Sequence, residues 1–177
     1  MNEMVKFGWV IWFTGVPASG KTTIANHLVA RLRSDGASVV ALDGDELRTG
    51  LCSDLNFSDL DRNENVRRAG FVAELVARSG SIAVCTFVSP FARSRLEVRN
   101  LLPADRFLEV FVRCPLAVCR ERDPKGLYKM QKTGKVAGLT GVDAPYEPPL
   151  DPEVVIDSDR MKPERAARIV ERLMVER

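Results

Sequence analysis

Gly15, Gly20, Lys21 and Thr22 fit the spacing G-x-x-x-x-G-K-[ST] near the start of the chain. Glycines at these positions let the backbone curl so that successive N–H groups point toward an anion. The Lys21 ammonium can reach β- and γ-phosphates, and the Thr22 hydroxyl can ligate Mg²⁺. The four residues therefore predict a binding site for the phosphates of a nucleotide and for a magnesium ion.

A phosphate-binding loop of this kind requires a strand before it and a helix after it. The apolar, β-branched run at residues 10–13 predicts the strand, and residues 21–33 carry apolar side chains at helical spacing. The alternative is a chance match in a turn rich in glycine, alanine and serine. Because the strand and the helix both fall where the motif requires them, we favour phosphate binding.

Asp43 and Asp45 flank a glycine directly after the short apolar segment 38–42, which predicts a buried parallel strand. Acidic residues at the carboxyl end of such a strand face the crevice where α/β proteins bind ligands. An Asp-Gly-Asp run is also typical of a plain turn. We favour a functional site, because a phosphate-binding loop needs a carboxylate near Mg²⁺ and the other strands offer no good candidate.

The segment from Pro124 to Val142 contains no acidic residue and several glycines. Its lysines, three or four residues apart, are Lys125, Lys129, Lys132 and Lys135. This spacing predicts that the lysines share one face of a helix. A mobile basic flap suits a lid, over about residues 122–146, that closes on phosphates and excludes water. The alternative is a disordered basic loop.

Three other polar features have plainer interpretations. His27 is expected at a surface or half-buried position of the first helix. Glu109 lies among apolar residues of a predicted strand and is expected to be partly exposed. A polar cluster begins the predicted helix 59–78 and is interpreted, from charge pattern alone, as a solvated face. The cluster consists of Asp61, Arg62, Asn65, Arg67 and Arg68.

Predicted strands and helices alternate along the chain. The strands lie at about residues 8–14, 38–42, 81–88, 106–112 and 153–157, and the helices at about 21–33, 59–78, 93–102, 116–121 and 164–175. This alternation predicts one α/β domain over residues 1–177, with a five-stranded parallel sheet flanked by helices and the size of a P-loop kinase. No N-K-x-D sequence occurs, which disfavours a Ras-like GTPase.

The composition narrows the class of protein further. The 177 residues suit one domain with its own core, and the net charge of +2 is too small to predict a nucleic-acid partner. No apolar run is long enough to span a membrane, and residues 1–6 show no signal-peptide pattern. The four cysteines form no C-x-x-C pair and there is one histidine, so zinc is not expected. Reduced thiols in a cytoplasm are the expectation.

Five segments follow the phosphate-binding loop in a characteristic order. They are LDGDELR (42–48), FSDLDRNENVRR (57–68), FVSPF (87–91), RDPKGLY (122–128) and GLTGVDAPYEPP (138–149). With these segments the chain closely resembles the adenylyl-sulfate kinases over nearly its whole length. The resemblance implies a P-loop kinase that uses ATP and Mg²⁺ to phosphorylate the ribose 3′-hydroxyl of adenylyl sulfate (APS), a step of sulfate assimilation.

The resemblance also implies roles for individual residues. The ATP phosphates would be held by Gly15, Ala18, Ser19, Gly20, Lys21, Thr22 and Thr23. The second substrate would be held by Asp45, Arg48, Phe57, Arg62, Asn65, Val88, Ser89, Lys125, Gly138 and Leu139. Phe57 would stack on its adenine, while Arg62 and Asn65 would bind its phosphosulfate and ribose. This reverses the solvated-face interpretation of the polar cluster.

The catalytic candidates implied by the resemblance are Lys21, Asp43 and Ser89. Thr22 and Asp43 would hold Mg²⁺, and we expect Asp43 to orient and deprotonate the acceptor hydroxyl. The alternative is that Asp43 serves only the metal and Asp45 orients the hydroxyl. Ser89 corresponds to a phosphoserine intermediate in some members of the family. We expect Ser89 to position the substrate instead, because no His or Lys adjoins it in sequence to activate it.

Two positions depart from the family pattern. Asn56 replaces a usual Gly before Phe57, and because Asn tolerates a positive φ better than most residues, we expect the turn there to be preserved. Leu139 replaces a usual Phe that closes on the other side of the substrate adenine. Losing that stacking costs about 1 kcal/mol, so we expect weaker substrate binding or weaker substrate inhibition than in a relative with Phe.

Two rival interpretations and two partners stay open. The chain could be a P-loop kinase for a sugar acid or a nucleotide, which segments 42–48 and 122–128 argue against. It could also be a catalytically silent nucleotide-binding module, which the intact Lys21, Thr22 and Asp43 argue against. Members of the family often form homodimers, and a functional link to an ATP sulfurylase is also open. No residue identifies a contact surface for either partner.

Overall fold

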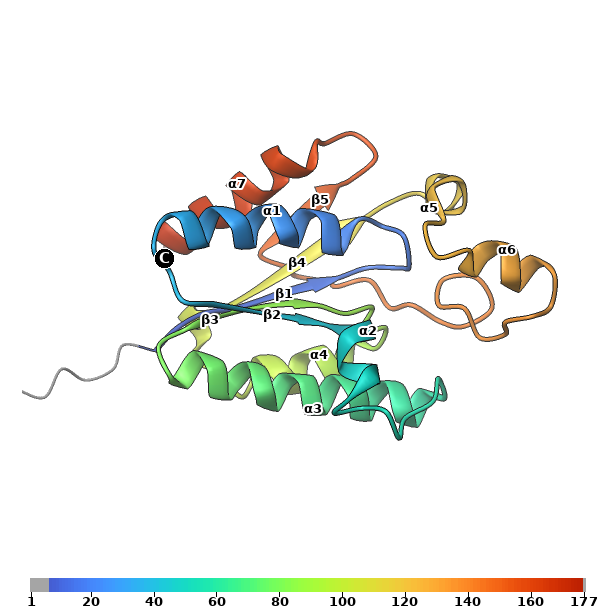
Figure 1. Cartoon of the computed structure of the whole chain (residues 1–177), viewed down its shortest axis with the longest axis horizontal. Coiled ribbons are helices and arrows are strands. Elements are labelled where there is room, and N and C mark those ends of the chain that lie inside the picture. Colours follow the sequence, from blue (N-terminus) through green and yellow to red (C-terminus); the bar gives the residue numbers. More distant parts are fainter. Residues whose placement is uncertain (1–6, 177) are drawn as a thin grey trace, which may run out of the picture.

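The computed structural model describes residues 7–176, which form a three-layered α/β structure (Figure 1). The strands are β1 (Val10–Thr14), β2 (Val39–Asp43), β3 (Ile82–Thr86), β4 (Phe107–Arg113) and β5 (Val154–Asp157). All pairs are parallel and the order is β2-β3-β1-β4-β5. The five-stranded parallel sheet of the prediction is confirmed, and β1 at its centre delivers the glycine-rich loop to the middle of the sheet edge. The signal-peptide expectation for residues 1–6 lies outside the described residues.

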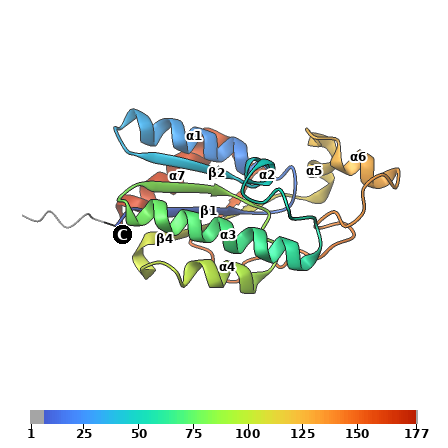
Figure 2. The ribbon, with the colours of Figure 1, turned by 60° about the horizontal axis from the view of Figure 1, so that its bottom comes forward.

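Helices cover both faces of the sheet. One face carries α1 (Lys21–Ser34) and α7 (Pro163–Val175), and the other carries α3 (Asp59–Arg78) and α4 (Ala92–Arg99), as the two views show (Figures 1 and 2). A hydrophobic core lies on each face of the sheet, and alternate side chains of β1 belong to one or the other. Ile11 and Phe13 pack on the face of α1, and Val10 and Trp12 pack on the face of α3. All four are fully buried, and burial of side chains of this size contributes roughly 2 kcal/mol each.

The segment that follows β4 extends beyond the carboxyl ends of the strands (Figure 1). It contains α5 (Leu116–Arg122) and α6 (Leu127–Lys132). The expectation that four lysines share one helix face is wrong, because Lys125 precedes α6 and Lys135 follows it. The helix starts after Gly126 and ends before Gly134, two left-handed glycines that interrupt helical geometry. Two further short helices are α2 (Gly44–Thr49) and the 3₁₀ turn η1 (Ala104–Arg106).

The expectation of partial exposure for Glu109 is also wrong. Glu109 is 7% exposed and pairs with Arg95 and Arg99 of α4. A buried carboxylate is tolerated where basic partners neutralise it. These partners come from another element, so the apolar run around Glu109 could not reveal them. His27 is half-buried on α1, as expected.

Local signals in the sequence set several helix boundaries. The Ser58 hydroxyl accepts a hydrogen bond from the Asp61 N–H and caps α3, and Pro163 opens α7. Both follow from the unsatisfied N–H groups of a first helical turn. Among residues 7–176, no helix combines the length and the apolar character that crossing a bilayer would require.

Candidate active site

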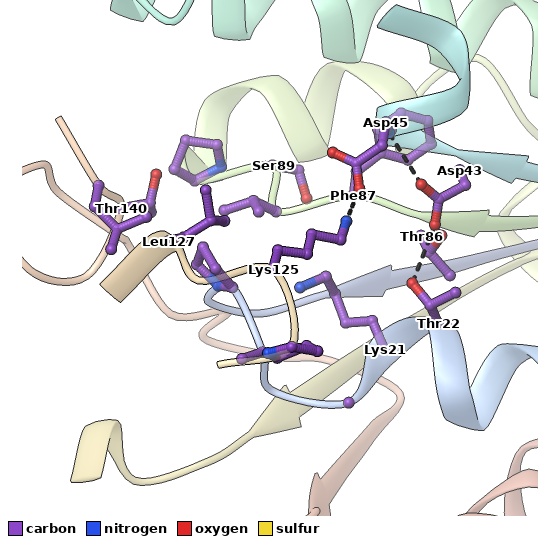
Figure 3. Close-up of a pocket in the computed structure, with 18 of the residues that line it drawn as sticks. Lys21, Thr22, Asp43, Asp45, Thr86, Phe87, Ser89, Lys125, Leu127 and Thr140 are labelled. Atoms are coloured by element: carbon purple, nitrogen blue, oxygen red, sulfur yellow. Dashed lines mark hydrogen bonds and ion pairs between the residues drawn. The ribbon is translucent and has the colours of Figure 1, made fainter. Parts of the chain in front are cut away.

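A cavity of about 970 Å³ lies where the carboxyl ends of the strands meet the lid segment (Figure 3). Its wall includes Ala18, Gly20, Lys21, Thr22, Thr23, Asp43, Asp45, Arg48, Phe57, Arg62, Asn65, Val88, Ser89, Lys125, Gly138 and Leu139. The structure thus brings together every predicted site residue except two. Gly15 and the buried Ser19 belong to the glycine-rich loop but do not line the cavity.

The conformation of the glycine-rich loop depends on two glycines. Gly15 has φ +152°, and a Cβ there would lie 2.5 Å from the Val112 carbonyl oxygen, which no side chain could tolerate. Gly20, with φ +101°, is the residue from which α1 begins. The loop therefore presents the N-terminus of α1 to the cavity, and such a terminus attracts phosphate.

Lys21 lies in the curl of this loop. Its Nζ donates to the carbonyl oxygens of Gly15 and Val16 at 2.8 and 2.9 Å. Burial lowers the pKa of Lys21 from 10.5 to about 8. Lys21 and Lys125 both point into the cavity (Figure 3), so two ammonium groups converge on the place where the loop would hold phosphate.

Asp43 is fixed by three hydrogen bonds. Its Oδ2 accepts from the hydroxyls of Thr22 at 3.0 Å and Thr86 at 2.6 Å, and its Oδ1 accepts from the Asp45 N–H at 2.9 Å. A carboxylate beside a hydroxyl at a phosphate site fits Mg²⁺, which binds through one or two protein oxygens plus phosphates. Residues 7–176 contain no cluster of three or more His, Cys, Asp or Glu side chains that would form an all-protein metal cage.

The lid segment contacts the sheet side of the cavity through two basic residues. Lys125 pairs with Asp45 at the start of α2 (Figure 3). Arg62, from α3, donates to the Gly138 carbonyl and to the Thr140 hydroxyl, both at 2.7 Å. The first pair is largely exposed and adds little stability, but together the contacts hold the lid over the cavity.

An aromatic ring stands among guanidinium groups at the far end of the cavity. Phe57 is 65% exposed, and the guanidinium carbons of Arg48 and Arg62 lie 4.4 and 5.6 Å from its ring centroid. Partial burial lowers the pKa of both arginines from 12.5. An exposed aromatic face next to two cations suits a ligand that combines a flat ring with negative charge.

The sequence model for the family described as "Adenylylsulphate kinase" matches residues 7–157. The chain belongs to the adenylylsulphate kinase family.

Individual relatives agree with this assignment. An adenylyl-sulfate kinase of Bacillus pumilus is 50% identical over 157 residues, which are 89% of this chain and 80% of that protein. The solved structure of a Mycobacterium tuberculosis APS kinase in complex with AMPPNP and APS has a TM-score of 0.90 and 40% identity, over 96% of this chain and 98% of that one. A hexameric APS kinase from Thiobacillus denitrificans has a TM-score of 0.73 and 30% identity, over 98% of this chain and 30% of that one.

Within this adenylylsulphate kinase fold, Asn56 has no left-handed backbone. Among the described residues other than glycine, positive φ occurs at Ala18, Ser89 and Asp123. The idea that Asn56 preserves a positive-φ turn is therefore wrong. Its carbonyl oxygen instead accepts a hydrogen bond from Arg48 at 2.9 Å, a contact that any residue at this position can provide.

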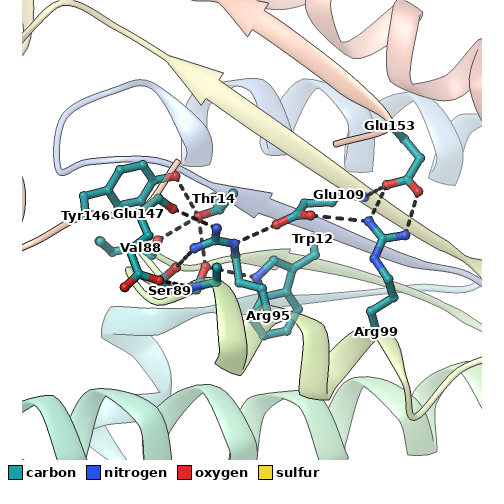
Figure 4. Close-up of polar contacts among 11 residues, drawn as sticks. Trp12, Thr14, Val88, Ser89, Arg95, Arg99, Glu109, Tyr146, Glu147 and Glu153 are labelled. Atoms are coloured by element: carbon teal, nitrogen blue, oxygen red, sulfur yellow. Dashed lines mark hydrogen bonds and ion pairs between the residues drawn. The ribbon is translucent and has the colours of Figure 1, made fainter. Parts of the chain in front are cut away.

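Ser89 is buried, with 2% of its surface exposed. Its Oγ accepts from the Trp12 indole N–H at 3.1 Å and donates to the Thr14 hydroxyl at 3.0 Å (Figure 4). Neither partner is a base that could activate the hydroxyl for attack on phosphorus. This geometry supports the expected positioning role.

Sequence reasoning missed further residues on the cavity wall, including the polar side chains of Thr86, Arg122 and Tyr128. Thr86 stands opposite Asp43 in the sheet register, and its position at the carboxyl end of a predicted strand was a usable signal. Arg122 donates to the Ser158 carbonyl at 2.7 Å, and the Tyr128 hydroxyl donates to the Pro17 carbonyl at 2.9 Å. Both arise from contacts across the chain that no local pattern encodes.

Proposed function

We propose that this chain transfers the γ-phosphoryl group of ATP to the ribose 3′-hydroxyl of adenylyl sulfate, giving 3′-phosphoadenylyl sulfate and ADP. One observation carries the proposal: in a chain of this family, one cavity joins the glycine-rich loop around Lys21 to the aromatic and guanidinium cluster around Phe57. The relatives named above are adenylyl-sulfate kinases, and one related structure holds AMPPNP and APS.

At one end of the cavity, the loop 15–23 would hold the ATP phosphates. Lys21 would supply a positive charge beside these phosphates, and two carbonyl oxygens of the loop hold its amine there. Thr22 and Asp43 would hold Mg²⁺, which when bound would neutralise charge on the phosphate oxygens. The adjacency of the Thr22 hydroxyl and the Asp43 carboxylate supports this assignment.

At the other end, Phe57 would stack on the adenine of adenylyl sulfate. Arg48 and Arg62 flank that ring and would bind the phosphosulfate, to which a guanidinium can donate two hydrogen bonds. Asn65 is 6% exposed, and its Nδ2 has no hydrogen-bond partner although it lies at the cavity wall. Since a buried amide N–H is costly without an acceptor, a ligand oxygen is its natural partner.

The transfer step needs alignment more than covalent chemistry. The ribose oxygen attacks the γ-phosphorus, the bond from that phosphorus to the ADP oxygen breaks, and the hydroxyl proton passes to Asp43. Val88 and Ser89 would position the ribose, and Lys125, Gly138 and Leu139 would close on the substrate from the lid. Asp45 is the alternative orienting group, and its ion pair with Lys125 links it to the lid.

Three broader assignments rest on family resemblance and composition. We propose that, besides binding its small-molecule substrate, the chain forms a homodimer and that it is functionally linked to an ATP sulfurylase. All four cysteines carry free thiols, which supports a cytoplasmic location.

The test of the function is an ATP-to-ADP assay with and without adenylyl sulfate, with the 3′-phosphorylated product identified by mass spectrometry. We expect ADP formation to depend on adenylyl sulfate and to match product one to one. Turnover with a sugar acid or a nucleotide in its place would identify another kinase. Tight ATP binding without turnover of any acceptor would identify a silent nucleotide-binding module.

A further inference from the structure

Arg95 on α4 is a buried charge, 3% exposed, that donates in three directions (Figure 4). Its Nε, Nη1 and Nη2 lie 2.7 Å from Glu109 Oε1, the Ser89 carbonyl oxygen and the Glu147 carbonyl oxygen, respectively. Glu109 neutralises the charge. The Ser89 and Glu147 carbonyls carry no net charge, so their hydrogen bonds do not neutralise Arg95. These bonds instead fix the two chain segments to which the carbonyls belong.

The first of these segments is the turn 88–90, which lines the cavity. Ser89 has φ +38°, a backbone conformation that residues with a side chain adopt only when their surroundings impose it. Trp12 holds the Ser89 hydroxyl and Arg95 holds the Ser89 carbonyl. Thr14 adds two more contacts, because its hydroxyl donates to the Val88 carbonyl and accepts from the Ser89 hydroxyl, and these contacts together hold the conformation of the turn.

The second segment consists of residues 146–147, where the lid ends, and we call it the strap. The strap makes further contacts with this turn, with the start of α4 and with the end of β1. The Glu147 N–H donates to the Pro90 carbonyl at 2.8 Å, the Glu147 carboxylate accepts from the Ala92 N–H at 2.7 Å, and the Tyr146 hydroxyl lies 3.0 Å from the Thr14 hydroxyl. Arg95 bonds both the turn and the strap through their backbone carbonyls, and the Thr14 hydroxyl of β1 also contacts both, at the Val88 carbonyl and the Tyr146 hydroxyl.

We propose that Arg95 is a positioning residue that sets the turn 88–90 and the strap in one fixed relation, and thereby controls affinity for the acceptor substrate. This inference rests on the proposed function. None of the three acceptors of Arg95 belongs to the glycine-rich loop, so ATP binding should depend on Arg95 far less than acceptor binding does.

Arg99 provides a matched control on the same helix. It also pairs with Glu109, at 3.3 Å, and it pairs with Glu153 at 2.6 Å. Its hydrogen bonds run to these two carboxylates and to neither the turn nor the strap. Removing Arg99 therefore disturbs the buried charges while leaving the contacts of the proposal in place.

The experiment compares Arg95→Met, Arg95→Lys and Arg99→Met with the parent. Steady-state kinetics give KM for adenylyl sulfate and for ATP, and hydrogen exchange by mass spectrometry follows peptides that contain residues 88–92 and 146–147. For Arg95→Met we expect KM for adenylyl sulfate to rise at least about tenfold, KM for ATP to stay within about twofold, and exchange to accelerate in both peptides. Arg95→Lys should raise KM for adenylyl sulfate less than Arg95→Met does, because it keeps the positive charge. Some rise should remain, because one ammonium cannot donate in the three directions of a guanidinium. Arg99→Met should change neither KM nor exchange in these peptides.

A double variant, Arg95→Met with Glu109→Met, separates an effect on positioning from an effect on folding. Arg95→Met alone leaves the buried Glu109 carboxylate without one of its two basic partners, and the double variant removes that carboxylate as well. It should recover stability toward urea while its KM for adenylyl sulfate stays raised. Recovery of KM in the double variant, an equal rise in Arg99→Met, or unchanged exchange in Arg95→Met would each overturn the proposal. If the parent does not phosphorylate adenylyl sulfate, the proposed function fails, and the exchange measurements still decide whether Arg95 fixes the turn and the strap.

Discussion

Thr86 on β3 stands opposite Asp43 on β2, and its hydroxyl donates to Asp43 Oδ2 at 2.6 Å. The same oxygen accepts from Thr22 at the start of α1. Hydroxyls from a strand and from a helix thus hold one carboxylate oxygen, and the Asp45 N–H holds the other. The orientation of Asp43 is set by the fold, which is the condition for electrostatic preorganisation at a reacting centre.

The first prediction concerns Asp43→Asn, which removes the charge and the proton acceptor at nearly constant shape. We expect kcat to fall at least about 100-fold and the dependence on Mg²⁺ concentration to shift upward. Asp45→Asn should mainly raise KM for adenylyl sulfate. Steady-state kinetics with a Mg²⁺ titration measure both. Normal turnover of Asp43→Asn would refute the assignment, and a large loss of kcat in Asp45→Asn alone would favour Asp45 as the orienting group.

The control for Asp43→Asn is Thr86→Val, which removes one donor to the carboxylate and leaves its charge. We expect a fall in kcat of about tenfold or less, because the hydrogen bonds from Thr22 and from the Asp45 N–H remain. A loss as large as that of Asp43→Asn would mean that the orientation of the carboxylate matters as much as its charge.

The layers of the fold were predictable because each buried strand is a short apolar run between polar turns. Residues 38–42 predicted β2 to within one residue, and residues 106–112 likewise predicted β4. The helix starts marked by the Ser58 cap and by Pro163 in the first turn of α7 were equally local. The burial of Glu109 was not predictable. Its partners Arg95 and Arg99 lie on another element, α4, and no local pattern in the sequence relates that helix to the strand of Glu109.

The candidate site was predictable to the extent that a motif or a strand end marks it. Lys21 and Asp43 follow from such marks, and Phe57 and Arg62 follow only from family resemblance. The bonds of Arg62 to Gly138 and Thr140 join positions more than 70 residues apart, so no spacing could reveal them. The same holds for the two β1 partners of the Ser89 hydroxyl.

The second prediction concerns the pH dependence of ATP binding. Burial lowers the pKa of Lys21 to about 8, so the amine is charged below that pH and loses its proton above it. Bound phosphates favour the charged form and raise this pKa, so binding above pH 8 takes up a proton. The dissociation constant for ATP should therefore rise by up to about tenfold per pH unit above about pH 8.

Titration with a fluorescent ATP analogue from about pH 7 to 9.5 measures this dependence. Lys21→Met should bind more weakly, without the rise above pH 8, and Lys21→Arg should also lack the rise, because arginine stays charged throughout. A parent whose affinity is constant over this range would contradict the prediction.

The third prediction is that Ser89→Ala retains kcat within about tenfold of the parent. The hydroxyl is buried and makes hydrogen bonds to Trp12 and Thr14. Its loss therefore removes two contacts that hold the turn, but it does not remove a catalytic nucleophile. Leaving the Trp12 N–H without a partner should cost about 1–3 kcal/mol of unfolding free energy, measurable by urea denaturation. A phosphoenzyme at Ser89 that forms and decays as fast as turnover, trapped with radiolabelled ATP, would show that the serine acts covalently.

The fourth prediction concerns Leu139, which is 6% exposed, packs with Cys119 and Tyr128, and lines the cavity. A phenylalanine does not fit the space of a packed leucine, so in Leu139→Phe the ring should extend into the cavity, where it can stack on the substrate adenine. Stacking of about 1 kcal/mol lowers the dissociation constant for adenylyl sulfate about fivefold and strengthens inhibition at high substrate. Leu139→Met keeps the volume without a ring and should leave both constants unchanged. If calorimetry finds the same affinity for Leu139→Phe and the parent, Leu139 does not contact the adenine and its departure from the family pattern affects packing alone.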